Sequence, residues 1–267
     1  MRNVRRWAGL ASAICVLLNT AAQADAVNEW NQIALEMAAA SNSSERHALH
    51  TIATVHAAMF EALNFIEARY VQRHAVTTSG LHGASPEAAA ATAAHDALGR
   101  IFPGQEQALN DRLRRSLDAM RDDRGSAAGS IAGKSVAAIV WAARGDKTAT
   151  ADPLAPTSPT GTGSRIDPHA WNGVMVALGA ATHLLAIERA RLYAMVSLAA
   201  EEAYIEASHA GARGAGQPAV PCAGCAVQAA VARVLEGQLS NVQRVDGRTI
   251  GTAIGKRVFL EYYTLAP

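Results

Sequence analysis

Apolar and small residues recur every three or four positions along most of this chain, and that spacing predicts α-helices. Runs of alternating β-branched and polar residues, which would predict strands, are scarce, and aromatic residues make up only 5% of the sequence. The expected helices cover residues 30–40, 45–69, 85–101, 105–121, 126–144, 171–209, 226–239 and 247–264. The pattern therefore predicts an all-α protein, a helical bundle of about eight or nine helices.

Segments rich in proline and glycine divide this helical pattern. The stretch DPLAPTSPTGTGSRIDP has the composition of a loop, and it predicts a linker over residues 146–170. The chain then consists of an N-terminal helical half, residues 25–145, and a C-terminal helical half, residues 171–267. A second segment of this kind, 211–221, precedes the helix expected from Ala226.

The two halves share a faint repeat. WNQIALEMAAAS from Trp30 is similar to WNGVMVALGAAT from Trp171, and each is followed by a Glu-Arg pair. The spacing from the tryptophan to the glutamate is 15 residues for Glu45 and 17 for Glu188. One interpretation is a pair of related helical halves. The other is chance similarity between two Ala-rich helices.

The N-terminus has the layout of a secretory signal peptide. MRNVRRW is basic, and LASAICVLLNTAA is an apolar run shorter than the roughly 20 residues of a membrane-spanning helix. Ala22-Gln23-Ala24 then supplies the small residues of a cleavage site. We expect a signal peptide over residues 1–24, a periplasmic or secreted protein, and no integral membrane segment after cleavage. The alternative interpretation is a short membrane anchor.

The charge of the chain excludes one class of partner. The formal net charge is +1, and it falls to −2 when Arg2, Arg5 and Arg6 leave with the signal peptide. A near-neutral protein lacks the basic surface that non-specific nucleic-acid binding requires. We therefore expect no nucleic-acid partner.

Cys222 and Cys225 form the only C-x-x-C of the chain. Cys15 would leave with the signal peptide, so the exported protein would keep this pair in an oxidising compartment, where we expect a disulfide or two buried thiols. A redox-active pair would follow a strand of an α/β unit, and the pattern predicts none there. A zinc site would need two further ligands, and only His209 is near in sequence.

Several histidines lie on the predicted helices. His47 and His50 have the i, i+3 spacing that can place two imidazoles on one metal, but no acidic third ligand stands at a matching offset. His56 is interpreted as a helix-packing or capping residue. His95 and Asp96 are adjacent and point to different faces of their helix, so they do not form a dyad. We therefore predict no metal site.

Three segments resemble bacterial vanadium-dependent haloperoxidase-like proteins of the type 2 phosphatidic acid phosphatase superfamily. These segments are WNQIALEMAAA, VHAAMFEALNFIEARY from Val55, and ASPEAAAATAAHDALGRIFPGQ from Ala84. The similarity continues more weakly through ERARLYAMVSLAAEEAYIEA and the closing GTAIGKRV, and so extends over most of the chain after residue 24. The resemblance implies the helical bundle of that superfamily.

The resemblance also implies where the chemistry would lie. In that family three C-terminal motifs supply a lysine and an arginine, then a Pro-Ser-Gly-His loop at a helix start, and finally an arginine with the histidine that binds vanadate or takes the phosphoryl group. These groups suit an oxyanion, which needs convergent cations, backbone N–H donors and a nucleophilic imidazole.

Most of those motif residues are missing from this chain. The segment 221–225 stands where the second motif is expected, but Gly224 takes the place of its histidine. No lysine occurs between residues 147 and 256, and no histidine follows His209. Because such groups act as a unit, their joint loss should remove catalysis almost wholly. A substitute nucleophile would have to come from His169, His183 or His209.

The resemblance leaves a set of residues that would still bind an anion beside the helix expected from Ala226. This set is Arg213, Gly224, Cys225, Arg244 and Arg248. The competing interpretation is that each arginine is an ordinary solvated surface residue.

Three functional hypotheses follow. The first is an exported haloperoxidase-like scaffold with no catalytic residues, which holds no cofactor and binds a small anion or a protein partner. The alternative is a divergent vanadium-dependent haloperoxidase or acid phosphatase with a rebuilt active site, for which vanadate would be the cofactor. The third is a structural role in a homo-oligomer that pairs through exposed apolar helix faces.

Overall fold

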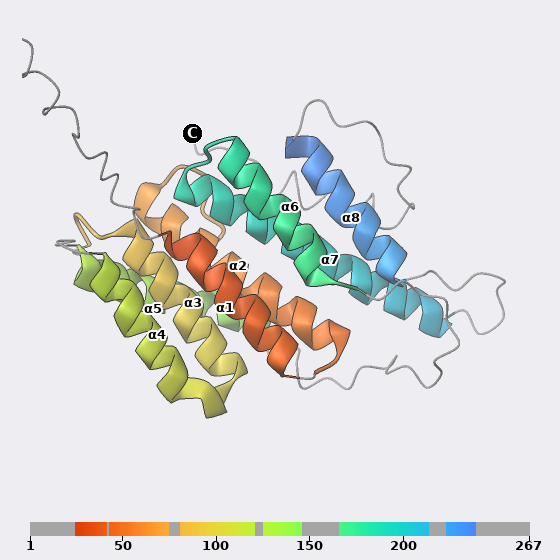
Figure 1. Ribbon diagram of the computed structural model, residues 1–267, viewed down its shortest axis with the longest axis horizontal. Coiled ribbons are helices and arrows are strands. Elements are labelled where there is room, and N and C mark those ends of the chain that lie inside the picture. Colours follow the sequence, from red (N-terminus) through yellow and green to blue (C-terminus); the bar gives the residue numbers. More distant parts are fainter. Residues whose placement is uncertain are drawn as a thin grey trace, which may run out of the picture.

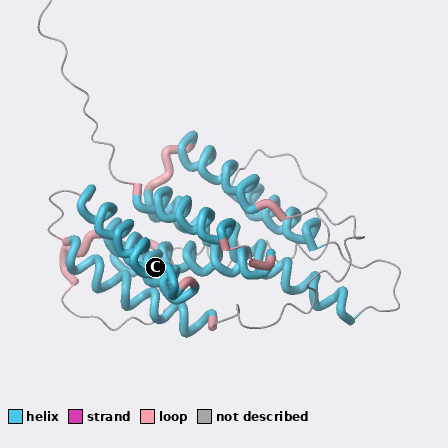
Figure 2. The backbone as a smooth tube through the Cα atoms, turned by 60° about the horizontal axis from the view of Figure 1, so that its bottom comes forward, coloured by secondary structure: helices cyan, strands magenta, loops and turns pink. Residues whose placement is uncertain are grey.

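The computed structural model of the protein describes residues 25–41, 43–74, 81–120, 125–145, 166–213 and 223–238. Within these ranges the chain forms eight α-helices and one 3-10 turn, and no strand (Figure 2). The helices are α1 (Ala26–Ala40), α2 (Glu45–Glu67), α3 (Pro86–Ile101), η1 (Pro103–Gln105), α4 (Glu106–Ala119), α5 (Ser126–Arg144), α6 (Pro168–Ala181), α7 (Ala186–Arg213) and α8 (Ala223–Gln238). The predicted all-α class is confirmed.

The expected signal peptide over 1–24, most of the linker over 146–170 and the closing helix over 247–264 lie outside the described residues. Where the two can be compared, several predicted boundaries were wrong. Helix α1 begins before Trp30, because the side chain of Asp25 accepts a hydrogen bond from the Asn28 N–H and caps the helix there. The single helix expected over 171–209 is two helices, because the chain turns at 182–185 with His183 in the left-handed region at φ 52°.

Helix α2 lies near the middle of the bundle, with α3, α5 and α4 on one side and α7 and α8 on the other (Figure 1). All side chains from Thr51 to Asn64 are buried. The apolar stripe expected on one face of this helix is therefore only part of its buried surface, because neighbouring helices cover the helix on every side.

One hydrophobic core runs through both expected halves. Its buried members include Trp30 from α1, Phe60 from α2, Leu98 from α3, Tyr193 from α7 and Val234 from α8. Helix α6 starts at Pro168 rather than at the predicted Trp171, so its first turn lies inside the range expected to be linker.

Helices α3 and α5 pack with their backbones in close approach. A Cβ atom at Gly129 would lie 2.4 Å from the carbonyl oxygen of Ser85, and one at Gly133 would lie 2.3 Å from that of Ala89. Only glycine fits such a contact. Of the described helices, α5 has the length and hydropathy of a membrane-spanning helix, and 33% of that stretch is buried inside the bundle.

The faint repeat corresponds to two pairs of helices. A shift of 141 positions carries Trp30 onto Trp171, and it carries Glu45, the first residue of α2, onto Ala186, the first residue of α7. Helices α1 and α2 therefore match α6 and α7 without a gap. The Glu-Arg pairs that marked the repeat are not equivalent, because Glu188 lies inside α7 whereas Glu45 begins α2.

Equivalent residues of the two copies touch each other. Asn31 hydrogen-bonds to Asn172, and His56 lies against the hydroxyl of Ser197, and each pair is separated by 141 positions. In a two-fold arrangement, a residue meets its own counterpart only near the axis. The contacts are therefore those expected of two helix pairs related by an approximate two-fold axis that passes between α1 and α6 and between α2 and α7.

Candidate functional site

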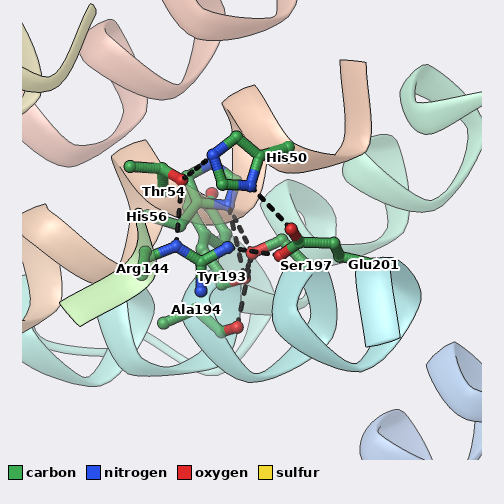
Figure 3. Close-up of polar contacts among 8 residues, drawn as sticks. All are labelled: His50, Thr54, His56, Arg144, Tyr193, Ala194, Ser197 and Glu201. Atoms are coloured by element: carbon green, nitrogen blue, oxygen red, sulfur yellow. Dashed lines mark hydrogen bonds and ion pairs between the residues drawn. The ribbon is translucent and has the colours of Figure 1, made fainter. Parts of the chain in front are cut away.

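Four polar side chains from α2, α5 and α7 form a closed ring in the core (Figure 3). Nδ1–H of His50 donates to Oε1 of Glu201 at 2.7 Å, because the carboxylate oxygen can only accept. Arg144 forms an ion pair with the other oxygen of Glu201, and its Nε–H donates to Oγ1 of Thr54 at 2.9 Å. The Thr54 hydroxyl lies 3.5 Å from Nε2 of His50, which completes the ring.

The ring holds the Glu201 carboxylate in its ionised form. Burial by itself raises the pKa of Glu201, but the Arg144 cation and the hydrogen bond from His50 outweigh it and hold the pKa at about 2. The Glu201 carboxylate is thus an anion opposite the Arg144 guanidinium, and the His50 Nδ1–H bonds to its other oxygen. Each carboxylate oxygen and both imidazole nitrogens have a partner inside the ring, so the arrangement favours a core-stabilising role over chemistry on a substrate.

A second buried network surrounds His56. Nε2–H of His56 donates to Oδ1 of Asn31 at 2.8 Å, and the same oxygen accepts from Nδ2 of Asn172 at 2.7 Å. Nδ1 of His56 lies 3.2 Å from the Ser197 hydroxyl and 3.3 Å from the Tyr193 carbonyl oxygen. Burial lowers the pKa of His56 to about 3, and the backbone carbonyl of Tyr193 offsets only part of that effect. His56 is thus a neutral core residue that links the two copies of the repeat.

A cavity of about 550 Å³ opens where α1, the start of α2 and the start of α6 meet. Its apolar walls include Leu35, Ile52 and Ile166, and its polar side chains are Ser43, Glu45, Asp167 and His169. A volume of this size lies in the range of small-molecule sites. Leu35 and Ile52, with Ala38, form a small hydrophobic cluster separate from the main core.

The carboxylates of the cavity are held by backbone groups. Oε1 of Glu45 accepts from the Ile166 N–H at 3.3 Å, and Oδ1 of Asp167 accepts from the His169 N–H at 2.9 Å as the cap of α6. Within the described ranges neither carboxylate forms an ion pair. The cavity therefore offers two acidic groups beside the N-termini of α2 and α6, whose dipoles favour negative charge.

The cavity and the polar ring lie on different faces of α2. Ile52 lines the cavity and Thr54 belongs to the ring, and two residues on an α-helix are about 200° apart around its axis. A molecule in the cavity would therefore meet neither His50 nor Glu201. Of the nearby histidines, only His169 lines the cavity.

The residues predicted to bind an anion can be compared with the structure only in part. Arg244, Arg248 and the side chain of Arg213 lie outside the described residues. Gly224 and Cys225 lie in the first turn of α8, which begins at Ala223, so their predicted position in a loop before a helix at Ala226 was wrong. Their amides are among the N-terminal N–H groups of α8 that lack an intrahelical acceptor.

The cysteine pair has one member in the described part of the chain. Cys225 is disulfide-bonded. Cys222 lies outside the described residues, so the pairing of these two cysteines stays a prediction.

The histidines considered as metal ligands point to different partners. The ring of His47 packs edge-on against Phe102 with centroids 5.7 Å apart, whereas His50 belongs to the polar ring. No group of three or more metal-binding side chains occurs among the described residues. Nε2 of His95 lies 2.8 Å from the Asn110 side-chain oxygen, while its neighbour Asp96 pairs with Arg100.

Sequence reasoning missed Glu201, Arg144 and Thr54 as partners of His50. Glu201 carried a usable signal, because a carboxylate within the apolar run of α7 is seldom buried without a partner. The Trp-Asn dipeptide repeated at Asn31 and Asn172 was visible as well. The contact between the two asparagines was not predicted.

Comparisons of this chain with protein-family models, with curated proteins and with solved structures found no match.

Proposed function

We propose that this protein is an exported helical scaffold of the haloperoxidase and phosphatase type that binds a ligand or a partner and performs no catalysis. The fold class agrees with such a bundle, and the basic and apolar N-terminal stretch is that of an exported chain. The sequence has no histidine after His209, where that family carries its nucleophile.

The observation that carries the proposal is the closed ring around Glu201. A catalytic histidine needs a nitrogen that faces a substrate, and a supporting carboxylate orients it. In this protein the only buried histidine next to a carboxylate, within the described residues, is His50, and Arg144 and Thr54 occupy the remaining positions. The ring therefore supports a stable core on which binding surfaces are displayed.

The test is a search for turnover. The purified protein is assayed with p-nitrophenyl phosphate for phosphatase activity, and with vanadate, hydrogen peroxide and bromide for halide oxidation. We expect rates equal to those of protein-free buffer. Turnover that is lost in His169→Ala or His209→Ala would refute the proposal and identify a rebuilt active site.

Vanadate calorimetry tests the anion-binding part of the proposal separately. Weak binding that is abolished in Arg244→Ala or Arg248→Ala would support the predicted anion set. Binding unchanged in both variants would place the anion elsewhere.

A further inference from the structure

The cavity between α1, α2 and α6 has a filled counterpart in the second copy of the repeat. The shift of 141 positions carries two of its wall residues, Ala48 and Ile52, onto Arg189 and Tyr193 of α7. It carries a third, Ala38, onto Gly179 of α6. On the second helix of each pair, alanine and isoleucine in the first copy thus correspond to the larger arginine and tyrosine in the second.

In the second copy those large side chains occupy the corresponding place and are held by polar contacts. A guanidinium nitrogen of Arg189 lies 3.0 Å from a carboxylate oxygen of Asp25, and the other donates to the Leu184 carbonyl at 3.1 Å. The stem of Arg189 lies against Gly179, where a Cβ atom would be only 3.0 Å from it. The hydroxyl of Tyr193 donates to the side chain of Asn28. The Arg189 guanidinium and the Tyr193 ring therefore occupy, in the second copy, the place that corresponds to the cavity.

At the cavity, acidic side chains are again present, and among the described residues that line it there is no lysine or arginine. Asp25, the cap of α1, pairs with Arg189 of the second copy, and Asp167, the cap of α6, lies at the cavity of the first copy. Glu45 adds a second carboxylate. Ala48 is too short to reach either group, so a space of about 550 Å³ remains.

We propose that this cavity binds a small organic cation, a guanidinium or amine attached to an aromatic or apolar group. The cation would pair with Glu45 and Asp167, since charge-assisted hydrogen bonds to carboxylates are the strongest that such groups make. The apolar part would lie on Leu35, Ile52 and Ile166. The ligand would thus supply what Arg189 and Tyr193 supply in the other copy. The proposal goes beyond the scaffold role, and it does not depend on the absence of catalysis.

Calorimetric titration with benzylguanidine tests the site, with benzyl alcohol as the neutral probe of similar shape. We expect binding of benzylguanidine at millimolar concentration or below, and affinity for the alcohol lower by about tenfold or more. Glu45→Gln and Asp167→Asn should each weaken benzylguanidine binding by about tenfold, and asparagine keeps the cap of α6. Glu36→Gln, on α1 outside the cavity, is the matched control and should leave binding unchanged.

Ala48→Arg tests the comparison between the copies. It places in the cavity the side chain that closes the second copy, so it should abolish benzylguanidine binding and raise Tm. Circular dichroism shows whether Ala48→Arg folds. If it does not fold, Glu45→Gln and Asp167→Asn test whether benzylguanidine binds in the cavity. Equal affinity for the neutral alcohol, binding unaffected in Glu45→Gln and Asp167→Asn, or no binding heat at all would overturn the proposal. A protein that binds benzylguanidine and also turns over phosphate esters would refute only the scaffold role.

Discussion

The side-chain amides of Asn31 and Asn172 hydrogen-bond to each other in both directions across 141 residues of chain. Nδ2 of Asn172 donates to Oδ1 of Asn31 at 2.7 Å, and Nδ2 of Asn31 donates back at 3.3 Å. Both residues are buried, and Oδ1 of Asn31 also accepts from His56. This pair joins the first helices of the two copies, α1 and α6.

Replacing Asn172 by alanine should destabilise the protein. The change leaves the Asn31 amide without its acceptor in a buried site, and an unsatisfied polar group of this kind costs about 1–3 kcal/mol. Urea denaturation measures the loss in the free energy of unfolding. Gln32→Ala, at an exposed position of α1, should change that free energy by less than about 0.5 kcal/mol. A loss for Asn172→Ala no larger than that of the control would show that the pair does not hold the copies together.

Glu201→Gln should lower stability near neutral pH by on the order of 3 kcal/mol, because it leaves the buried Arg144 cation without its anion. The folded-state pKa of Glu201, about 2, lies below its ordinary value of 4.5. Its stabilisation is therefore fully present above pH 4.5 and is lost as the pH falls toward 2. Chemical denaturation between pH 3 and 7 should show the difference between parent and variant shrinking on the acid side. Glu206→Gln, exposed on the same helix, serves as the control, and a difference independent of pH would contradict the ion-pair account.

Glu61→Gln should raise the stability of the protein at alkaline pH, whereas Glu201→Gln lowers it. Burial raises the pKa of Glu61 to about 7, and Arg73 offsets only part of that rise. A raised carboxyl pKa means that ionisation disfavours the folded state, so the penalty is absent below pH 4.5 and complete above pH 7. The neutral glutamine should therefore raise stability at pH 8 by up to about 3 kcal/mol and have little effect at pH 4.5. Thermal unfolding at the two pH values measures this, and a variant less stable than the parent at pH 8 would show that Glu61 is compensated when ionised.

Gly133→Ala should destabilise the packing of α3 on α5. The added methyl group would lie 2.3 Å from the carbonyl oxygen of Ala89, so the helices must move apart. We expect a loss of at least about 2 kcal/mol in the free energy of unfolding. Gly99→Ala is the matched control, because a Cβ at Gly99 in α3 meets nothing within 4 Å. It should stabilise the protein by roughly 0.5–1 kcal/mol through its helix propensity. Equal effects of the two substitutions would contradict the close approach.

Local signals in the sequence were enough to predict most of the helices. Ser85-Pro86-Glu87 was recognisable as a helix start, and the Ser85 hydroxyl does cap α3 by accepting from the Ala88 N–H. Gly145 was recognisable as the end of α5, and it has φ 69° there. Caps, breakers and the 3.6-residue period act within a few residues, so one sequence suffices to read them.

The residues of the candidate sites could not be predicted from the sequence, because they meet through long-range contacts that local sequence patterns do not indicate. The Ala-rich helices have similar composition on several faces, so composition does not indicate that His50 meets Glu201, 151 residues further on. The difference between Ala48 and Ile52 at the cavity and Arg189 and Tyr193 in the second copy depends on the register of α2 against α7, which follows from the packing of the two helices.

The sequence by itself determined the helical class, most helix ends and the similarity of the segments that begin at Trp30 and Trp171. The tertiary structure decided which of their side chains meet, which charges are balanced in the core and where a cavity is left. Helix formation is governed by neighbours along the chain, whereas these contacts follow from the packing of helix faces that are distant in the sequence.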